Sequence, residues 1–282
     1  MWPGERRLPR PFALQEFHEM SKVLTRIDGR VMTVTINRPE AMNALDPETQ
    51  ALMAEAFEAF AADDELWVAV VRGAGGRAFS AGGDIRAMRT ALEGGAPYRI
   101  PDSGYGGLTS RFDLDKPVIA AVEGIAMGGG FEVALACDIV LASRNASFAL
   151  PEPRIGAVAY AGGMHRLPRQ IGMKRAMDLL LTGRAIGADQ AEVWGLVNEV
   201  VEEGGMDAAI ARWCEALCAN APLALRATKA AVREGIGLPV DEAIRRQDAG
   251  GYAAIEAMRA SRDVVEGIMA FNEKRAPVWE GR

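Results

Sequence analysis

The fold is decided by residues 116–139, which read KPVIAAVEGIAMGGGFEVALACDI. The apolar run at 117–122 is typical of a buried strand, and a helix is predicted to begin in the glycine run at 128–130. The first N–H groups of that helix have no partners within it and carry the positive end of its dipole, so they can hold an oxyanion. Glycine also permits tight packing of a helix on a sheet, and the run alone fits both interpretations.

Alternating strands and helices extend to both sides of this stretch. Further runs of strand type lie at 31–36, 66–71, 138–142 and 146–150. Asp46 followed by Pro47 predicts the start of a helix, because these residues suit an N-cap and a first turn. One face of that helix is apolar and carries Met53, Ala56, Phe57 and Phe60. We therefore predict an α/β chain, with repeated units around a largely buried sheet.

Three regions are expected along the chain. Residues 1–20 are interpreted as a loose, disordered extension. Residues 21–205 form the α/β core, and 206–282 form a helical region, since from about residue 173 the only convincing strand is 197–201. Residues 93–115 are glycine-rich and irregular, and such a long loop in a compact domain is usually functional or mobile.

Composition excludes several classes of function. The chain has 32 Lys plus Arg against 38 Asp plus Glu in 282 residues, a net charge of −6, so we expect no nucleic-acid partner. It contains no apolar run long enough to span a membrane and no signal-peptide core. Three cysteines without zinc spacing predict no metal and a reduced, cytoplasmic protein. With two histidines, acid/base chemistry is expected of carboxylates.

Two short motifs were weighed and set aside. Residues 73–78, GAGGRA, satisfy GxGxxA, but the helix and the acidic strand end of a dinucleotide site do not follow. Ser80 lies in a sequence that resembles a nucleophile elbow, with Asp138 and His165 in the order of a catalytic triad. We expect loops on both sides of Ser80, whereas an elbow needs a strand before the serine and a helix after it.

Two carboxylates are the stronger candidates. Glu132 lies in the first turn of the helix that follows the glycines, and Glu152 lies between two prolines after the strand at 146–150. Separately, each has an ordinary explanation, as a charge that favours the helix dipole or as a loop residue. Two carboxylates on rigid elements, each after a strand, favour general acid/base work on a water molecule.

Over about residues 22–282 the sequence resembles the enoyl-CoA hydratase/isomerase superfamily, the crotonase family. The resemblance is carried by INRPEAMNAL at 36–45, AFSAGGDI at 78–85, the opening stretch at 116–139, ASFALPEPRIG at 146–156, AGGMHRLPRQIG at 161–172, LTGRAIGADQAEVWGLVNEVV at 181–201 and AFNEKRAPVW at 270–279. It implies an α/β crotonase (ClpP-like) spiral of repeated ββα units. It also implies that region 206–282 mediates a homotrimer or a dimer of trimers.

The resemblance assigns roles to particular residues. The backbone amides of Gly83 and Gly129 would form an oxyanion hole for the thioester oxygen of an acyl-CoA substrate. Glu132 would deprotonate the water that adds to Cβ, and Glu152 would deliver a proton to Cα. Coenzyme A would contact Ala41, Met42, Ala44, Ala81, Asp84 and Ile85. No permanently bound cofactor and no metal are implied.

This chain lacks one cation that the family pattern provides for the CoA phosphates. Glu40 stands where many hydratases carry a lysine, so Arg38, Arg86 or Lys274 from a neighbouring subunit is expected to replace it.

Retention of both glutamates favours a hydratase, which adds water reversibly and syn to trans-2-enoyl-CoA to give 3-hydroxyacyl-CoA. An enoyl-CoA isomerase or a carnitinyl-CoA dehydratase of the same superfamily is the alternative. The ending PVWEGR at 277–282 is similar to the carnitinyl-CoA dehydratase branch, and residues 156–163, GAVAYAGG, lack a proline common in this loop. A non-catalytic acyl-CoA-binding protein is the alternative of another class.

Overall fold

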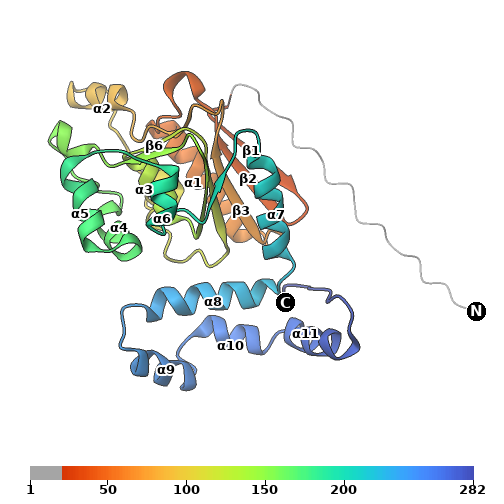
Figure 1. Cartoon of the computed structure of the whole chain (residues 1–282). Helices are drawn as coiled ribbons and strands as arrows, with labels where there is room; N and C mark the ends of the chain where they lie inside the picture. The colour runs from red at the N-terminus through yellow and green to blue at the C-terminus, as the bar shows by residue number, and fades with distance from the viewer. Residues whose placement is uncertain (1–20) are drawn as a thin grey trace, which may run out of the picture.

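The described part of the chain, residues 21–282 of this computed structural model, contains two β-sheets and eleven α-helices (Figure 1). The strands are β1 (Val23–Asp28), β2 (Val31–Ile36), β3 (Val68–Gly73), β4 (Ala78–Ser80), β5 (Val118–Val122), β6 (Ile125–Met127), β7 (Ile139–Ser143), β8 (Ser147–Ala149), β9 (Ile186–Gly187) and β10 (Glu199–Val201). One sheet has the order β1-β2-β3-β5-β7-β10 and the other β4-β6-β8-β9. All neighbours run parallel except β1 with β2 and β8 with β9.

The helices complete the repeated units. They are α1 (Pro47–Ala62), α2 (Ile85–Leu92), α3 (Gly129–Ala136), α4 (Gly163–Ile171), α5 (Met173–Thr182), α6 (Ala188–Val193), α7 (Met206–Cys218), α8 (Pro222–Gly235), α9 (Val240–Asp248), α10 (Ala253–Arg259) and α11 (Arg262–Glu273). The pairs β3–β4, β5–β6 and β7–β8 each place their first strand in the six-stranded sheet and their second in the four-stranded sheet. Helices α1, α2 and α3 follow β2, β4 and β6. The predicted spiral of ββα units is therefore confirmed.

The central strands β3 and β5 of the six-stranded sheet are buried on both faces, which explains their continuous apolar sequences. In β3, Ala69 and Val71 pack in the main core with Phe57 and Phe131, whereas Val68 and Val70 pack toward α7. The burial of each such valine or phenylalanine side chain stabilises the fold by about 1.5–3 kcal/mol. Because both faces are covered, strands such as β3 and β5 read as apolar runs without alternation.

Helix α1 begins where the sequence predicts it. Asp46 is the N-cap, and its Oδ1 accepts the Thr49 N–H at 2.8 Å. The four apolar residues expected on one face are all buried: Met53, Ala56, Phe57 and Phe60. The helix thus covers the sheet with the predicted face.

One local expectation is wrong, and one strand was not predicted. Ser80 ends a strand, β4, so the segment before it is not a loop; three residues paired with β6 are too short for periodicity to reveal. Strand β1 was not predicted, since it is an edge strand whose side chains are mostly exposed. The interpretation of residues 1–20 as an extension lies outside the described residues.

The C-terminal helices are arranged in two ways. Helix α7 packs on the six-stranded sheet through Met206, Ala209 and Cys214. Figure 1 shows α8, α9, α10 and α11 (blue) as a separate layer below the sheets. Within residues 21–282, no helix is long and apolar enough to cross a membrane.

Candidate active site

The glycine run at the start of α3 serves both packing and access. A methyl group placed on Gly130 at ideal geometry would lie 2.4 Å from the carbonyl oxygen of Ser80, so this glycine permits close packing on β4. Gly128 has φ +50° and no side chain to cap the helix, and α3 begins at Gly129. The two interpretations of the run therefore apply to different glycines. Gly130 permits tight packing on β4, whereas Gly129 borders the candidate site and can hold an oxyanion there.

Two backbone amides lie close together at this point. Leu45 N–H donates to Gly82 O at 2.8 Å, and Asp84 N–H donates to Leu45 O at 3.1 Å. These two hydrogen bonds lie on either side of Gly83 and do not use its N–H group. A methyl on Gly129 would lie 3.6 Å from Gly83 N. Within residues 21–282, neither Gly83 N–H nor Gly129 N–H donates to a backbone or side-chain acceptor. Both remain available to one ligand oxygen.

Glu132 is a buried carboxylate with an unusual pKa. Its side chain projects from the first turn of α3, and the residue is 3% exposed. Its Oε1 accepts the Gly163 N–H at 2.8 Å. Burial, together with the charge of Glu152, raises the pKa of Glu132 to about 7, although the Gly163 hydrogen bond acts in the opposite direction. Glu132 can therefore exchange protons near neutral pH.

Glu152 faces the same glycine run from the turn after β8. A methyl on Gly128 would lie 3.0 Å from Glu152 Oε1. The other oxygen, Oε2, is buried and has no hydrogen-bond partner within residues 21–282. Burial raises the pKa of Glu152 above its ordinary value. A raised pKa makes the protonated form, which can donate a proton, more populated than it is in an ordinary carboxyl group.

The residues predicted to contact coenzyme A lie on two adjoining segments. Ala81 N–H donates to Met42 O at 2.9 Å, and the Leu45–Gly83 bridge joins the same segments. The set consists of Ala41, Met42 and Ala44 on one segment and Ala81, Asp84 and Ile85 on the other. Asp84 also has a structural role, since its Oδ1 accepts the Arg86 and Ala87 N–H groups at the start of α2.

The three candidate phosphate-binding cations differ. The guanidinium of Arg38 bonds Asp84 Oδ2 at 3.0 Å and the Ala44 carbonyl, so it is already occupied. Arg86 is exposed at the start of α2. Lys274 is exposed at the end of α11, which Figure 1 shows far from α2 in the same chain. Lys274 can therefore serve this site only from another subunit.

Residues 93–115 contribute two phenols that were not predicted. A methyl on Gly83 would lie 3.1 Å from the hydroxyl of Tyr98 and 3.2 Å from that of Tyr105. Gly163, the hydrogen-bond partner of Glu132, was also missed. The signal for Tyr105 is its position in SGYGGL, a lone aromatic residue among glycines.

The serine-hydrolase interpretation does not fit the geometry. Ser80 is fully buried, and its hydroxyl donates to the Asn43 carbonyl at 2.8 Å rather than to an imidazole. His165 is exposed on α4. The turn after β3 leads to β4 and not to a helix, which likewise excludes the dinucleotide motif. Among residues 21–282, no group of three or more His, Cys, Asp or Glu side chains could hold a metal ion.

Comparison with known sequences identifies the family. Residues 26–282 match the family model described as enoyl-CoA hydratase/isomerase. The chain belongs to the enoyl-CoA hydratase/isomerase family. The resemblance seen in the sequence is thereby confirmed.

Relatives within this family carry two names. A carnitinyl-CoA dehydratase from Salmonella typhi is 44% identical over 260 residues, which are 92% of this chain and 98% of that protein. The crystal structure of an enoyl-CoA hydratase from Mycobacterium tuberculosis H37Rv has a TM-score of 0.85 at 38% identity, covering 93% and 99% of the two chains. The crystal structure of an enoyl-CoA hydratase from Bacillus anthracis has a TM-score of 0.81 at 30% identity, and the match covers 93% of this chain and 100% of that one.

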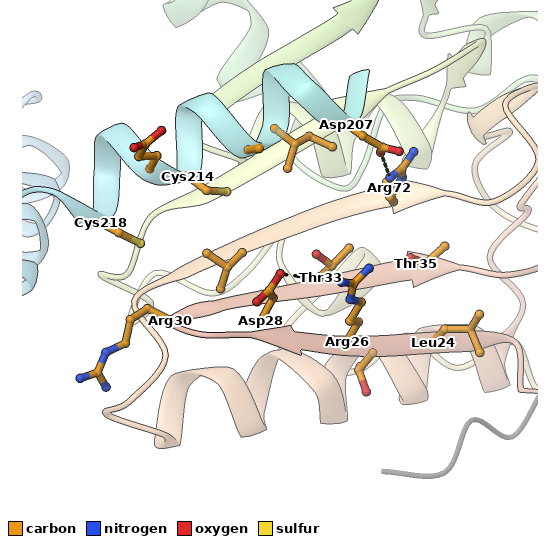
Figure 2. Close-up of a pocket in the computed structure, with 15 residues that line it drawn as sticks. Leu24, Arg26, Asp28, Arg30, Thr33, Thr35, Arg72, Asp207, Cys214 and Cys218 are labelled. Carbon is orange, nitrogen blue, oxygen red and sulfur yellow. Dashed lines mark hydrogen bonds and ion pairs between the residues drawn. The ribbon is translucent and has the colours of Figure 1, made fainter. Parts of the chain in front are cut away.

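This enoyl-CoA hydratase/isomerase family member has a hollow of about 690 Å³ between the outer strands and α7 (Figure 2). It contains none of the predicted site residues. Three arginines line it, and each has a carboxylate partner: the pairs are Arg26–Asp28, Arg30–Glu65 and Arg72–Asp207. Because these cations are neutralised, the hollow is a poor anion site.

Proposed function

We propose that the chain catalyses the reversible syn addition of water to a trans-2-enoyl-CoA thioester, giving a 3-hydroxyacyl-CoA. The observation that carries the proposal is the pair of carboxylates, buried Glu132 and partly buried Glu152, beside the unbonded amides of Gly83 and Gly129. One acid and one base next to an oxyanion hole are the groups that this reaction requires.

Each step uses one of these groups. The thioester oxygen accepts the two N–H groups, and each such donor typically lowers the barrier by about 3–4 kcal/mol. Glu132 takes a proton from water as the water oxygen bonds Cβ. The electrons of the double bond move toward the thioester oxygen, and Glu152 delivers a proton to Cα. One H and one OH are thus added, which leaves Glu132 protonated and Glu152 ionised. Before the next turnover Glu132 releases a proton to solvent and Glu152 takes one up, so the protons balance.

The coenzyme A part is proposed to lie along the two adjoining segments at 41–45 and 81–85. Arg86 of the same chain and Lys274 of a neighbouring subunit are proposed to meet its phosphates, since Arg38 is bound to Asp84. A phosphate close to either cation would gain from a charge-assisted contact.

Assembly into a trimer, or a dimer of trimers, is proposed through the C-terminal helical region, 206–282. Its helices expose large apolar side chains, a pattern that marks interaction surfaces: Ile236 (73%), Val240 (76%), Val265 (63%), Ile268 (59%) and Phe271 (85%). A neighbouring subunit is also what brings Lys274 to a site. A cytoplasmic location stays a prediction from the sequence.

Dehydration of carnitinyl-CoA is the second candidate. Relatives 44% identical over 92% of this chain carry that name. A dehydratase runs the same addition in reverse, so Glu132 and Glu152 would keep their places. The two candidates differ in the acyl group, because the carnitinyl group adds a quaternary ammonium. Tyr98 and Tyr105 are aromatic rings at the acyl site, and such rings attract that cation.

The test is a panel of thioesters presented to the purified protein. Crotonyl-CoA, a 3-enoyl-CoA and carnitinyl-CoA are supplied in turn, and the enoyl absorbance is followed. We expect loss of the crotonyl-CoA signal with formation of 3-hydroxybutyryl-CoA. Turnover of carnitinyl-CoA alone would establish the second candidate, and turnover of the 3-enoyl ester alone would indicate an isomerase. Tight binding without turnover of any ester would leave a non-catalytic binding protein.

A further inference from the structure

Tyr105 is held rigidly at the edge of the candidate active site. It begins a tight turn in which Gly104 and Gly106 adopt φ of +81° and +58°. Its N–H donates to Thr109 Oγ1 at 2.8 Å, and the next N–H, of Gly106, donates to buried Gln50 Oε1 at 2.7 Å. The direction of the phenol is therefore set by its backbone and not left to a mobile loop.

The Tyr105 ring lies on the same face of α3 as the base. A methyl on Gly129 would lie 2.7 Å from Cδ1 and 2.8 Å from Cε1 of this ring. Glu132 is three residues after Gly129 in the helix, and residues at that spacing share a face. The adjoining Gly128 lies against Glu152 Oε1. The Tyr105 ring thus lies against the glycine run that adjoins Glu152 and leads into Glu132.

The electrostatics agree with this placement. Burial raises the pKa of Tyr105 above its ordinary value, and Tyr98, Glu132 and Glu152 raise it further. The hydroxyl therefore holds its proton more tightly than an ordinary phenol, and it acts as a neutral donor or acceptor.

Tyr98 differs from Tyr105 although their hydroxyls meet at Gly83. The Tyr98 O–H donates to the Leu45 carbonyl, so its proton is committed to the backbone. Within residues 21–282, the Tyr105 hydroxyl donates to no backbone acceptor. It donates to the oxygen of Tyr98 instead, and a proton held by a neutral phenol can turn to a substrate oxygen.

We propose that Tyr105 is a further catalytic residue, whose hydroxyl donates a hydrogen bond to the oxygen that joins or leaves Cβ. The inference rests on the proposed hydration and holds for either acyl group. A water molecule has two hydrogens and two lone pairs. Its hydrogens point to Glu132 and Glu152, one lone pair attacks Cβ, and Tyr105 donates to the other. In the reverse direction Tyr105 stabilises the departing oxygen, and it keeps its own proton throughout.

The first test is Tyr105→Phe, which removes only the oxygen. We expect kcat for crotonyl-CoA to fall about 10- to 100-fold, the loss typical of one hydrogen bond to a group that bears charge, with KM changed less than about 3-fold. Tyr252→Phe, at a buried phenol of the C-terminal helices, is the matched control for the loss of such an oxygen. An unchanged kcat in Tyr105→Phe overturns the inference and leaves the hydration standing.

The second test measures binding and needs no turnover. Calorimetry compares 3-hydroxybutyryl-CoA, which has the Cβ oxygen, with butyryl-CoA, which lacks it. Tyr105→Phe should weaken the binding of the hydroxy ester about 10-fold and leave the affinity for butyryl-CoA unchanged. Unchanged binding of butyryl-CoA also shows that the variant is folded. Equal weakening of both esters would place the hydrogen bond on the thioester oxygen and overturn the inference. If the wild type turned over no enoyl ester yet showed the Tyr105-dependent preference, hydration would fail and the contact would stand.

Discussion

Replacing Glu132 by Gln should stabilise the protein at pH 8 while it destroys the proposed activity. Burial raises the pKa of Glu132 from 4.5 to about 7. A carboxyl whose pKa is raised on folding contributes stability at low pH, and that stability is lost as the pH rises toward 7. The raised pKa corresponds to about 3 kcal/mol. Glutamine resembles the protonated acid, and its Oε1 still accepts the Gly163 N–H, so the variant escapes this loss.

The assay is denaturant unfolding at pH 5 and pH 8, with the same protein concentration for both proteins. The advantage of Glu132→Gln over the wild type should grow by about 2–3 kcal/mol between the two pH values. Glu55→Gln makes the same change on the exposed face of α1 and is the control. A variant no more stable than the wild type at pH 8 would refute the reasoning, since it would mean that the folded protein tolerates the Glu132 charge without penalty.

Three further predictions concern the base, its support and the assembly. Because Glu132 must be charged to accept a proton, kcat/KM for crotonyl-CoA should rise with pH through about 7 and level off above it; a flat profile from pH 5 to 8 would argue against this base. In Gly163→Ala a methyl would lie 3.0 Å from Glu132 Oε1 and 2.9 Å from Ala159 Cβ, so the carboxylate should move. We expect kcat to fall about 100-fold, while CoA-ester binding, measured by calorimetry, persists. Phe271→Asp should reduce sedimenting trimers to smaller species, because burial of an exposed phenylalanine contributes about 2 kcal/mol; an unchanged sedimentation coefficient would exclude α11 from the interface.

The strands and helices of the core could be predicted because local patterns and tertiary packing agree there. The apolar runs of β3 and β5 are buried on both faces, and the Asp46 carboxylate caps α1 by accepting a backbone N–H group. The two glutamates were found because each follows a strand on a rigid element. Their proximity could not be derived from spacing, since it depends on how the units of the spiral stack.

The missed features have physical reasons. Strand β4 is three residues long, which is below the length at which alternation can be read. Tyr98 and Tyr105 lie in a segment without periodicity. The turn that directs Tyr105 depends on the positive φ angles of Gly104 and Gly106 and on the packing of Gly106 against α1 and α3. The hydrogen bond between Gly163 and Glu132 joins residues 31 positions apart, and no local pattern encodes it.

The central claim is that Glu132 and Glu152 together carry out the addition of water. It is tested most directly by following crotonyl-CoA at its enoyl absorbance with the wild type, Glu132→Gln and Glu152→Gln, after calorimetry has shown that all three bind butyryl-CoA. We predict that each single variant loses about 10²- to 10⁴-fold in kcat, the usual contribution of a positioned acid or base. Turnover by either variant within a few-fold of the wild type would contradict the account.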